Sequence, residues 1–171
     1  LNPHCRFYDK RIGQSTTLTG RQIVKHMAGK VNEIITGEFD YRGKAIIYGD
    51  TDSCYFSAYK TLKKDIDSGQ IPWSKETVIQ LYDQVGNEVN NTFPKFMQDS
   101  FHCPKSRGEV IKAGRELVAS KGLFITKKRY AVLYYDKEGK RTDVDGKPGK
   151  IKAMGLDLKR SDTPEFIQNF L

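Results

Sequence analysis

At 171 residues the chain is long enough for a compact domain with its own hydrophobic core. Its hydrophobic content of 37%, with nine Phe and nine Tyr, excludes a disordered protein, and no apolar run approaches the ~18 residues that a membrane span requires. The formal net charge is +8, and the three cysteines are widely spaced, so neither a disulfide framework nor a zinc site is indicated. We therefore expect a protein of the reducing cytoplasm that does not bind membranes.

The positive charge is concentrated in one region. Residues 105–160 hold 16 Lys and Arg against 7 Asp and Glu, whereas the rest of the chain holds 13 against 14. Clustered positive charge is typical of a surface that meets a phosphate backbone. Charge alone favours this interpretation no more than it favours an ordinary solvated basic face.

The N-terminal part of the chain predicts a helix followed by a hairpin. Apolar residues at helical spacing predict a helix from about residue 16, which Gly37 ends. Residues 44–48 form a short apolar run, residues 49–52 have turn chemistry, and residues 54–57 return as a second apolar run. This pattern is typical of a β-hairpin.

The middle of the chain predicts a second helix. Residues 65–70 read as a polar loop, after which Ser74 is placed to cap the helix. An apolar stripe continues to about Asn91, and Pro94 follows, so we expect the helix to end between them.

The last third of the chain predicts antiparallel strands. The expected extended segments are 117–118, 123–125, 130–135 and 150–154, with a hairpin turn at 136–139. The whole order predicts an α+β fold, an antiparallel sheet with helices packed on one face. Because the chain begins at Leu1 and stops at Leu171, just as a helix with Thr163 at its N-cap begins, we expect this fold to be truncated at both ends.

Two aspartates in the predicted hairpin turn are the sharpest chemical signal. Apolar runs flank Asp50 and Asp52 on both sides, so the turn can present both carboxylates to the same side. Paired carboxylate oxygens on a rigid backbone suit Mg²⁺, which keeps several waters and also binds substrate phosphates. Taken alone, an Asp-Thr-Asp turn is more often structural, because Asp accepts hydrogen bonds from nearby backbone amides.

A run of three cations is the second signal. Lys127, Lys128 and Arg129 lead into an apolar strand at Tyr130. Strand alternation would send Lys128 and Tyr130 to one face and Lys127 and Arg129 to the other, so that one face can meet a nucleic-acid strand. Taken alone, such a run is more often a solvated surface.

Both signals resemble motifs of family B DNA polymerases, and they occur in the order that this family has. The string from Tyr48 to Ser53 resembles the acidic motif of the palm, and the string from Lys127 to Tyr130 resembles the motif that grips the primer strand. Residues 6–9 and 16–19 are similar to the stretch that follows the fingers helix in polymerases of T4-like bacteriophages. The resemblance covers nearly the whole chain.

The resemblance implies a catalytic site for nucleotidyl transfer with two Mg²⁺ ions, or Mn²⁺ in their place. It assigns Asp52 as the main metal ligand, Asp50 to a supporting catalytic and metal-binding role, and Thr51 and Ser53 to cofactor binding. Residues 115–119 resemble the stretch with an accessory acidic residue, which makes Glu116 the third catalytic candidate and Glu109 its competitor. The residues assigned to DNA and primer binding are Tyr48, Lys127, Lys128, Arg129, Tyr130, Lys152, Gly155 and Arg160.

The resemblance also implies how the chain is organised. Residues 1–155 correspond to part of a palm domain, with residues 1–15 just after the fingers helix, and residues 156–171 correspond to the start of a thumb. The implied partners are primer-template DNA, a dNTP, the remainder of the polymerase chain and, through the parent enzyme, a sliding clamp. The implied process is phage DNA replication in the host cytoplasm.

The family's first palm motif, with a further metal-binding aspartate, and its fingers helix have no counterpart here. We therefore expect the chain to be inactive by itself. The alternative interpretation is a non-catalytic DNA-binding remnant, or one half of a split polymerase.

Overall fold

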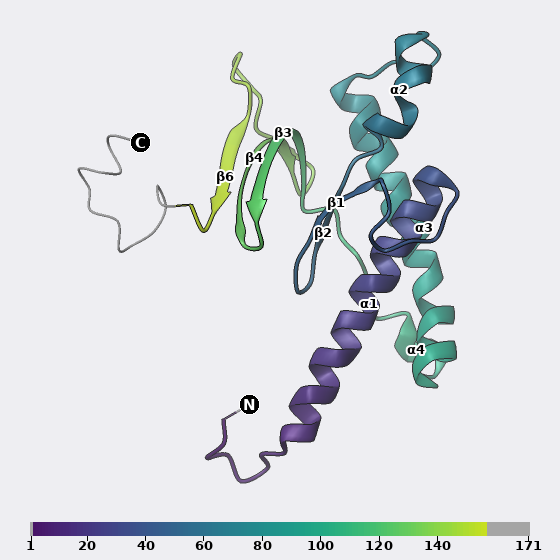
Figure 1. Ribbon diagram of the computed structural model, residues 1–171, viewed down its shortest axis with the longest axis vertical. Helices are drawn as coiled ribbons and strands as arrows, with labels where there is room; N and C mark the ends of the chain where they lie inside the picture. The colour runs from purple at the N-terminus through teal and green to yellow at the C-terminus, as the bar shows by residue number, and fades with distance from the viewer. Residues whose placement is uncertain (1, 157–171) are drawn as a thin grey trace, which may run out of the picture. The chain divides into compact units, whose positions relative to one another are not determined.

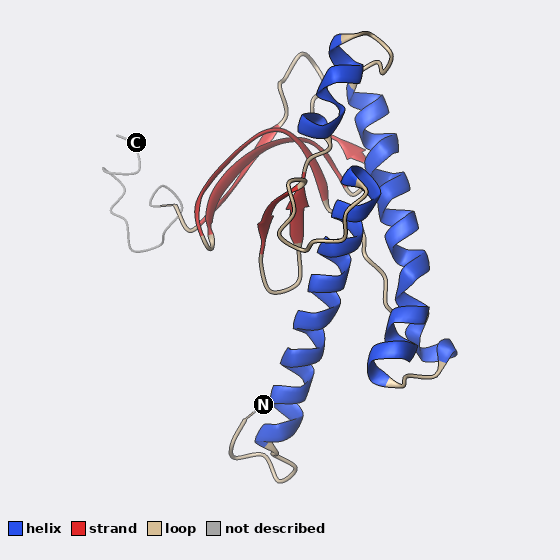
Figure 2. Cartoon of the chain, turned by 45° about the vertical axis from the view of Figure 1, so that its right-hand side comes forward, coloured by secondary structure: helices blue, strands red, loops and turns tan. Residues whose placement is uncertain are grey.

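The structure, a computed structural model, describes residues 2–156 and divides them into two compact units. One unit comprises residues 2–73 and 84–113, and the other comprises residues 74–83 and 114–156. The expected α+β class with antiparallel strands is confirmed (Figure 1 and Figure 2). In the part of the chain that the structure describes, no helix combines the length and the apolar character that crossing a membrane requires.

Helix α1 (Lys10–Thr36) begins earlier than expected because an aspartate caps it. The Asp9 carboxylate accepts the backbone N–H of Arg11 at 2.8 Å, which satisfies a donor that the first helical turn leaves open. Gly37 ends the helix as expected. It has a left-handed φ of 84°, and its N–H donates to the carbonyl of Glu33 at 2.7 Å.

Helix α2 (Tyr59–Asp67) occupies residues that we expected in part to form a polar loop, so the loop prediction is wrong for residues 65–67. Leu62 and Ile66, one turn apart, are both partly buried in an otherwise charged segment. The ring of Tyr59 also packs on Trp73, with 5.6 Å between the ring centroids. The apolar pattern of this helix is short and weak, and packing on Trp73, outside the helix, helps to stabilise it.

Helix α3 (Lys75–Phe101) begins where the sequence predicts. The hydroxyl of Ser74 accepts the backbone N–H of Thr77 at 3.1 Å, as an N-cap does. The helix contributes most of the buried core of the first unit, in which α1 also takes part. The core residues are Val31, Val85, Val89 and Phe93.

The prediction that this helix ends before Pro94 is wrong, because α3 continues through the proline. A proline inside a helix costs ~3 kcal/mol. Phe93 and Met97 are both buried, and burying two such side chains contributes roughly 3–6 kcal/mol. The short helix α4 (Lys105–Gly108) also packs here, since a Cβ on Gly108 would lie 3.1 Å from the Cα of Pro94.

Strands β1 (Ile46–Gly49) and β2 (Cys54–Phe56) form the expected antiparallel hairpin. Ile46 pairs with Phe56, and both side chains pack against the core of the first unit. The base of the hairpin is therefore held by the hydrophobic core, while the turn between the strands lies beyond it.

The second unit contains a four-stranded antiparallel sheet. Its strands are β3 (Leu117–Thr126), β4 (Arg129–Lys137), β5 (Lys140–Arg141) and β6 (Lys150–Met154). Strand β4 pairs with β3 along one edge and with β5 and β6 along the other, and β6 has the predicted bounds. Figure 2 shows that the long strands are strongly arched.

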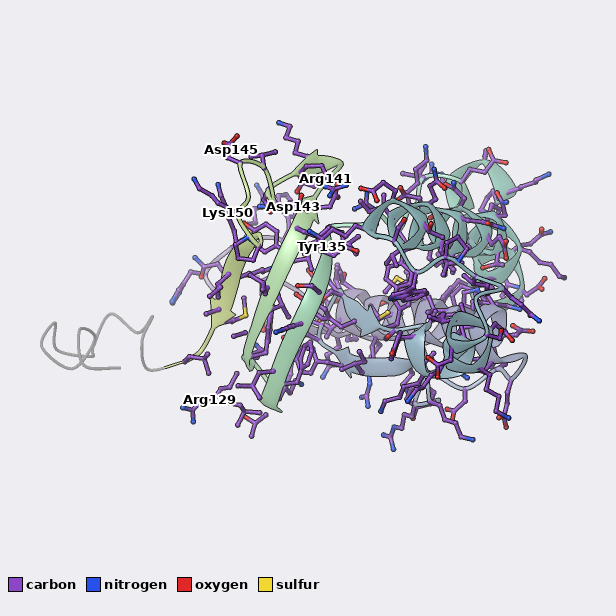
Figure 3. All side chains as sticks on the ribbon, turned by 90° about the horizontal axis from the view of Figure 1, so that it is seen from above. Arg129, Tyr135, Arg141, Asp143, Asp145 and Lys150 are labelled. Atoms are coloured by element: carbon purple, nitrogen blue, oxygen red, sulfur yellow. The ribbon has the colours of Figure 1, made fainter. Side chains whose placement is uncertain are left out.

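Ion pairs join the first turn of α3 to this sheet. Asp143 is almost fully buried and accepts Lys75 Nζ at 2.5 Å and two nitrogens of Arg141 at 2.8 Å. Arg141 also donates to Glu76 at 2.8 Å, and the cations of Lys75 and Arg141 lie 5.3 and 5.7 Å from the ring centroid of Tyr135. Figure 3 labels Tyr135, Arg141 and Asp143 of this group. Hydrogen bonds from Arg141 and Lys75 hold the pKa of Asp143 well below its usual range.

Candidate functional site

The predicted carboxylate turn lies at the tip of the β1–β2 hairpin. The N–H of Asp50 donates to the carbonyl of Ser53 at 2.9 Å, which leaves Thr51 and Asp52 at the tip. One oxygen of Asp50 accepts the N–H and the hydroxyl of Thr51 at 2.8 and 3.2 Å. The other accepts the hydroxyl of Tyr48 at 3.3 Å. The Asp50 carboxylate is therefore oriented by its own hairpin.

Asp52 is in a different situation from Asp50. It is exposed, and it makes no hydrogen bond or ion pair with any residue between 2 and 156. Its oxygens are thus available to a cation, whereas those of Asp50 are already engaged.

The two carboxylates fit a hard divalent cation. Mg²⁺ commonly takes one or two carboxylates and completes its shell with water and phosphate oxygens. Within residues 2–156, no group of three or more His, Cys, Asp or Glu side chains is placed to hold a metal ion. The turn therefore presents its two carboxylates without a third acidic, His or Cys side chain grouped with them among these residues.

Cys54, the first residue of β2, lies directly after the turn and is partly buried. Burial raises the pKa of its thiol to about 11. The thiol consequently stays protonated at neutral pH, and it is the thiolate that binds metals. In this hairpin the two carboxylates, and not the thiol, have the chemistry that suits a hard cation.

Asn32 of α1 holds the segment that leads into this hairpin, although it is not among the site residues expected above. Its side chain is buried, and its carbonyl oxygen accepts the N–H of Ala45 at 3.0 Å. Its amide nitrogen donates to the carbonyl of Glu38 at 2.8 Å, and a Cβ on Gly43 would collide with the amide. A polar residue inside the apolar stripe of a helix is the signal that identifies it.

The basic run forms a turn, so the expected strand alternation through it is wrong. Thr126 pairs with Arg129, which leaves Lys127 and Lys128 as the two loop residues of the β3–β4 hairpin. Lys128 has a left-handed φ of 63°, as a residue in such a tight hairpin loop commonly does. Both lysines are exposed at the tip, whereas Tyr130 is buried in the sheet.

Gly155, which directly follows β6, braces this tip. It has a φ of 61°, and a Cβ there would collide with the carbonyl oxygen of Lys128. The Nε of Arg129 donates to the carbonyl of Gly155 at 3.1 Å. The position of the two lysines therefore depends on close contact between the tip and the chain that leaves β6.

Glu116 and Lys152, two of the expected site residues, meet in the second unit. Lys152 Nζ lies 2.6 Å from an oxygen of Glu116. Arg115, which precedes Glu116 and is not among the expected residues, is anchored to Asp83 at 2.5 Å and to the buried Asp136. An arginine beside a candidate acid is visible in sequence, but its two partners are not.

The remaining expected residues divide between the units. Asp50, Asp52 and the exposed Glu109 belong to the first unit. Glu116, Lys152 and the tip of the β3–β4 hairpin with Lys127 and Lys128, called the basic tip below, belong to the second. Arg160 lies outside the described residues, as does the expected helix start at Thr163.

Comparisons with known proteins agree with the two motifs. A family model described as DNA polymerase family B matches residues 3–171. The DNA-directed DNA polymerase of Escherichia phage RB69 is 29% identical over 175 residues, which cover 97% of this chain and 19% of that enzyme. The DNA-directed DNA polymerase of Enterobacteria phage T4 is 28% identical, covering 99% of this chain and 19% of that enzyme.

A eukaryotic protein is similar as well. The DNA polymerase delta catalytic subunit of Candida albicans is 27% identical over 162 residues, covering 94% of this chain and 12% of that protein. The chain thus spans about a fifth of the length of its phage relatives.

Proposed function

Because the chain belongs to DNA polymerase family B, we propose that it is the part of a DNA-directed DNA polymerase that carries two catalytic carboxylates and a primer-binding hairpin. The reaction is attack of a primer 3′-hydroxyl on the α-phosphate of a dNTP, directed by a DNA template, in phage DNA replication. The observation that carries the proposal is the β1–β2 turn, in which Asp52 is exposed and unengaged beside an oriented Asp50.

The residues of the turn have distinct roles in this proposal. Asp52, supported by Asp50, would hold two Mg²⁺ ions, or Mn²⁺, together with ligands from the substrate and from other parts of the enzyme. Bound metal ions of this kind activate the attacking oxygen and stabilise the leaving one. Tyr48 and Thr51 fix the Asp50 carboxylate by hydrogen bonds. Thr51 and Ser53, on either side of Asp52, would contact the nucleotide. Glu116, with Glu109 as the alternative, would serve as the accessory acid.

The basic tip is proposed to bind the primer strand. Lys127 and Lys128 are exposed cations on a hairpin turn, a geometry that lets both reach phosphates near the 3′ end. Arg129 and Gly155 brace the turn, and Tyr130 anchors it in the sheet by stacking on Phe124, with 5.6 Å between the ring centroids. Lys152, Arg160 and Tyr48 complete the proposed set of contacts to primer-template DNA.

We further propose that residues 1–155 are part of a palm domain, with residues 1–15 following the fingers, and that residues 156–171 begin a thumb. Two carboxylates are an incomplete set for two metal ions, so the rest of the polymerase chain must supply further ligands. The purified 171-residue chain should therefore show no primer extension. The complete enzyme would act in the host cytoplasm, with a sliding clamp as a further partner.

The decisive variant is Asp52→Asn in the complete polymerase that contains this segment. Primer extension should be lost, while binding of primer-template DNA, measured by fluorescence anisotropy, should change little. Asp67→Asn is the matched control, because Asp67 is an exposed carboxylate at the end of α2 in the same unit. Extension by the Asp52→Asn enzyme at near the normal rate would remove Asp52 from its proposed role.

A further inference from the structure

The ion pair between Glu116 and Lys152 spans the sheet of the second unit. Glu116 directly precedes β3, and Lys152 lies on β6, so the two residues flank β4 on opposite edges. Lys152 pairs with Val132 in the register, whereas Leu117, the neighbour of Glu116, pairs with Lys137. The contact of 2.6 Å therefore runs diagonally over β4, across the arched sheet seen in Figure 2.

The Glu116 side of the pair is held firmly by the backbone. Arg115, one residue earlier, is anchored to Asp83 and Asp136, and the carbonyl of Glu116 accepts the N–H of Glu138 at 2.9 Å. The backbone of Glu116 is thus fixed, and the long side chain of Lys152 spans most of the distance between β6 and the Glu116 carboxylate. A lysine has several rotatable bonds, so Lys152 can change partner without any movement of the sheet.

The pair is nevertheless easy to separate. The side chains of Lys152 and Glu116 are 28% and 49% exposed, and ion pairs with this degree of exposure contribute little net stability and weaken with salt. A DNA phosphate near Lys152 offers the same charge-assisted hydrogen bond as the carboxylate. Two anions would then compete for one ammonium group.

The four other acids of this unit that form ion pairs among the described residues have partners other than Lys152. Glu76 pairs with Arg141, and Asp83 pairs with Arg115. Asp136 is bound by Arg115, and Asp143 by Lys75 and Arg141, and these two side chains are only 3% and 4% exposed. Glu116, by contrast, is partly exposed and pairs with Lys152, a lysine proposed above to contact DNA. Lys150, two residues from Lys152 and therefore on the same face of β6, is exposed.

We propose that Glu116 is an internal competitor for the phosphate that Lys152 binds, and that duplex DNA displaces the Glu116 carboxylate from Lys152. The inference rests on the proposed function, since it requires that the chain bind primer-template DNA. Its consequence is that the Glu116 carboxylate is released from Lys152 only when DNA is bound. Glu116 is then a positioning residue for Lys152 in the free protein.

The test compares variants of the 171-residue chain in binding to a primer-template duplex, by fluorescence anisotropy over a range of salt concentrations. Glu116→Gln removes the competing charge, so affinity at low salt should rise by about threefold, the change expected for losing a weak ion pair. In the parent chain, the carboxylate that DNA displaces takes up a cation from solution, which offsets part of the cation release from DNA. Glu116→Gln has no such carboxylate, so the slope of log affinity against log salt should steepen by about one. Lys152→Met should weaken binding, and Glu116→Gln should have no further effect in the Lys152→Met background.

Glu138→Gln is the matched control. Glu138 is an exposed acid in the β4–β5 turn of the same unit, so its neutralisation reports the effect of net charge alone. The exchanged variant Glu116→Lys with Lys152→Glu preserves the ion pair, and it should keep the thermal midpoint while losing DNA affinity.

Three results would overturn the proposed competition, and one would overturn the proposed function. Equal affinities and slopes for Glu116→Gln and the parent chain would overturn the competition, as would a gain that persists in the Lys152→Met background or that Glu138→Gln reproduces. A parent chain that binds no duplex at any salt concentration would instead overturn the proposed function, and this inference with it.

Discussion

Asn32 and Ala45 are joined by a hydrogen bond of 3.0 Å, from the backbone N–H of Ala45 to the side-chain carbonyl of Asn32. Ala45 is buried and directly precedes β1, so this bond fixes the start of the strand that carries Asp50. The geometry of the carboxylate turn thus depends on a residue of α1 that lies outside the hairpin.

Replacing Asn32 by Ala should destabilise the chain by on the order of 3 kcal/mol. The substitution leaves the buried N–H of Ala45 without a partner, which costs ~1–3 kcal/mol, and it removes the hydrogen bond to the carbonyl of the exposed Glu38, a further ~0.5–1.5 kcal/mol. Urea unfolding followed by circular dichroism measures the loss. Asn91→Ala is the control, because Asn91 is exposed on α3 and alanine favours a helix. Equal losses in the two variants would show that the Asn32 bonds contribute nothing.

Strong local signals predicted several elements correctly. Gly37 ends α1 because a glycine accepts the left-handed conformation there, and the apolar runs around Asp50 and Asp52 form the hairpin. Strand β6 has the predicted bounds because its apolar residues lie between turn-forming segments. Each of these features depends on residues that are adjacent in sequence.

The predictions that are wrong depend on contacts between distant residues. Helix α3 continues through Pro94 because the core buries Phe93 and Met97, and a proline rule cannot weigh that burial. The turn at Lys127 and Lys128 follows from the register of β3 on β4, which composition does not specify.

The candidate site divides in the same way. Asp50 and Asp52 were predictable as a carboxylate pair because a hairpin brings close neighbours together. The pairing of Glu116 with Lys152 was not, since it requires the positions of two strands on either side of β4.

The stability of the first unit should depend on the protonation of His26. Its ring stacks on Phe96, with 3.9 Å between the ring centroids, and Nε2 lies 2.9 Å from the hydroxyl of Thr92. Burial, and then the positive charge of Lys30, lower its pKa, against a smaller opposing effect of Glu33. The unfolded chain therefore binds the proton more readily than the folded chain does.

The sign of the pH dependence follows from that difference. The contribution of His26 to stability is complete above the unfolded pKa of ~6.5 and is lost as the pH falls toward the lower folded value. The urea midpoint of the parent chain should fall between pH 8 and pH 5, and His26→Gln should reduce this fall. His102→Gln, at an exposed histidine, is the control and should follow the parent chain. A fall of the same size in the His26→Gln chain would contradict the assignment.

Cys54 should react slowly with alkylating reagents. Its thiol has a pKa of about 11 because it is buried, so at pH 8 its thiolate fraction is on the order of a hundredfold lower than that of an ordinary cysteine. Cys5 is exposed and provides an internal comparison in the same sample. Mass spectrometry of iodoacetamide-treated protein should show Cys5 modified first, and the difference should vanish in denaturant. Equal rates in the folded chain would mean that the base of the carboxylate turn is open to solvent.

The brace between Gly155 and the basic tip gives the most specific test of the second unit. Gly155→Ala adds two effects: a left-handed φ of 61° that alanine disfavours, and a Cβ that collides with the carbonyl of Lys128. Gly139 has a φ of 80° and no atom within 4 Å of a Cβ, so Gly139→Ala adds only the first.

The two variants should differ in a defined way. Both should lose about 1–3 kcal/mol of stability for the left-handed residue, but Gly155→Ala should lose more, because its methyl group must displace either the tip or the chain after β6. Under the proposed function, only Gly155→Ala should also weaken binding of primer-template DNA, since it shifts Lys127 and Lys128 and breaks the hydrogen bond from Arg129. Urea unfolding and fluorescence anisotropy on the two purified chains measure both effects. Equal DNA affinities for the two variants would show that the position of the tip does not depend on the brace, because the close contacts with Lys128 and Arg129 are what Gly155→Ala adds to the strain that both substitutions share.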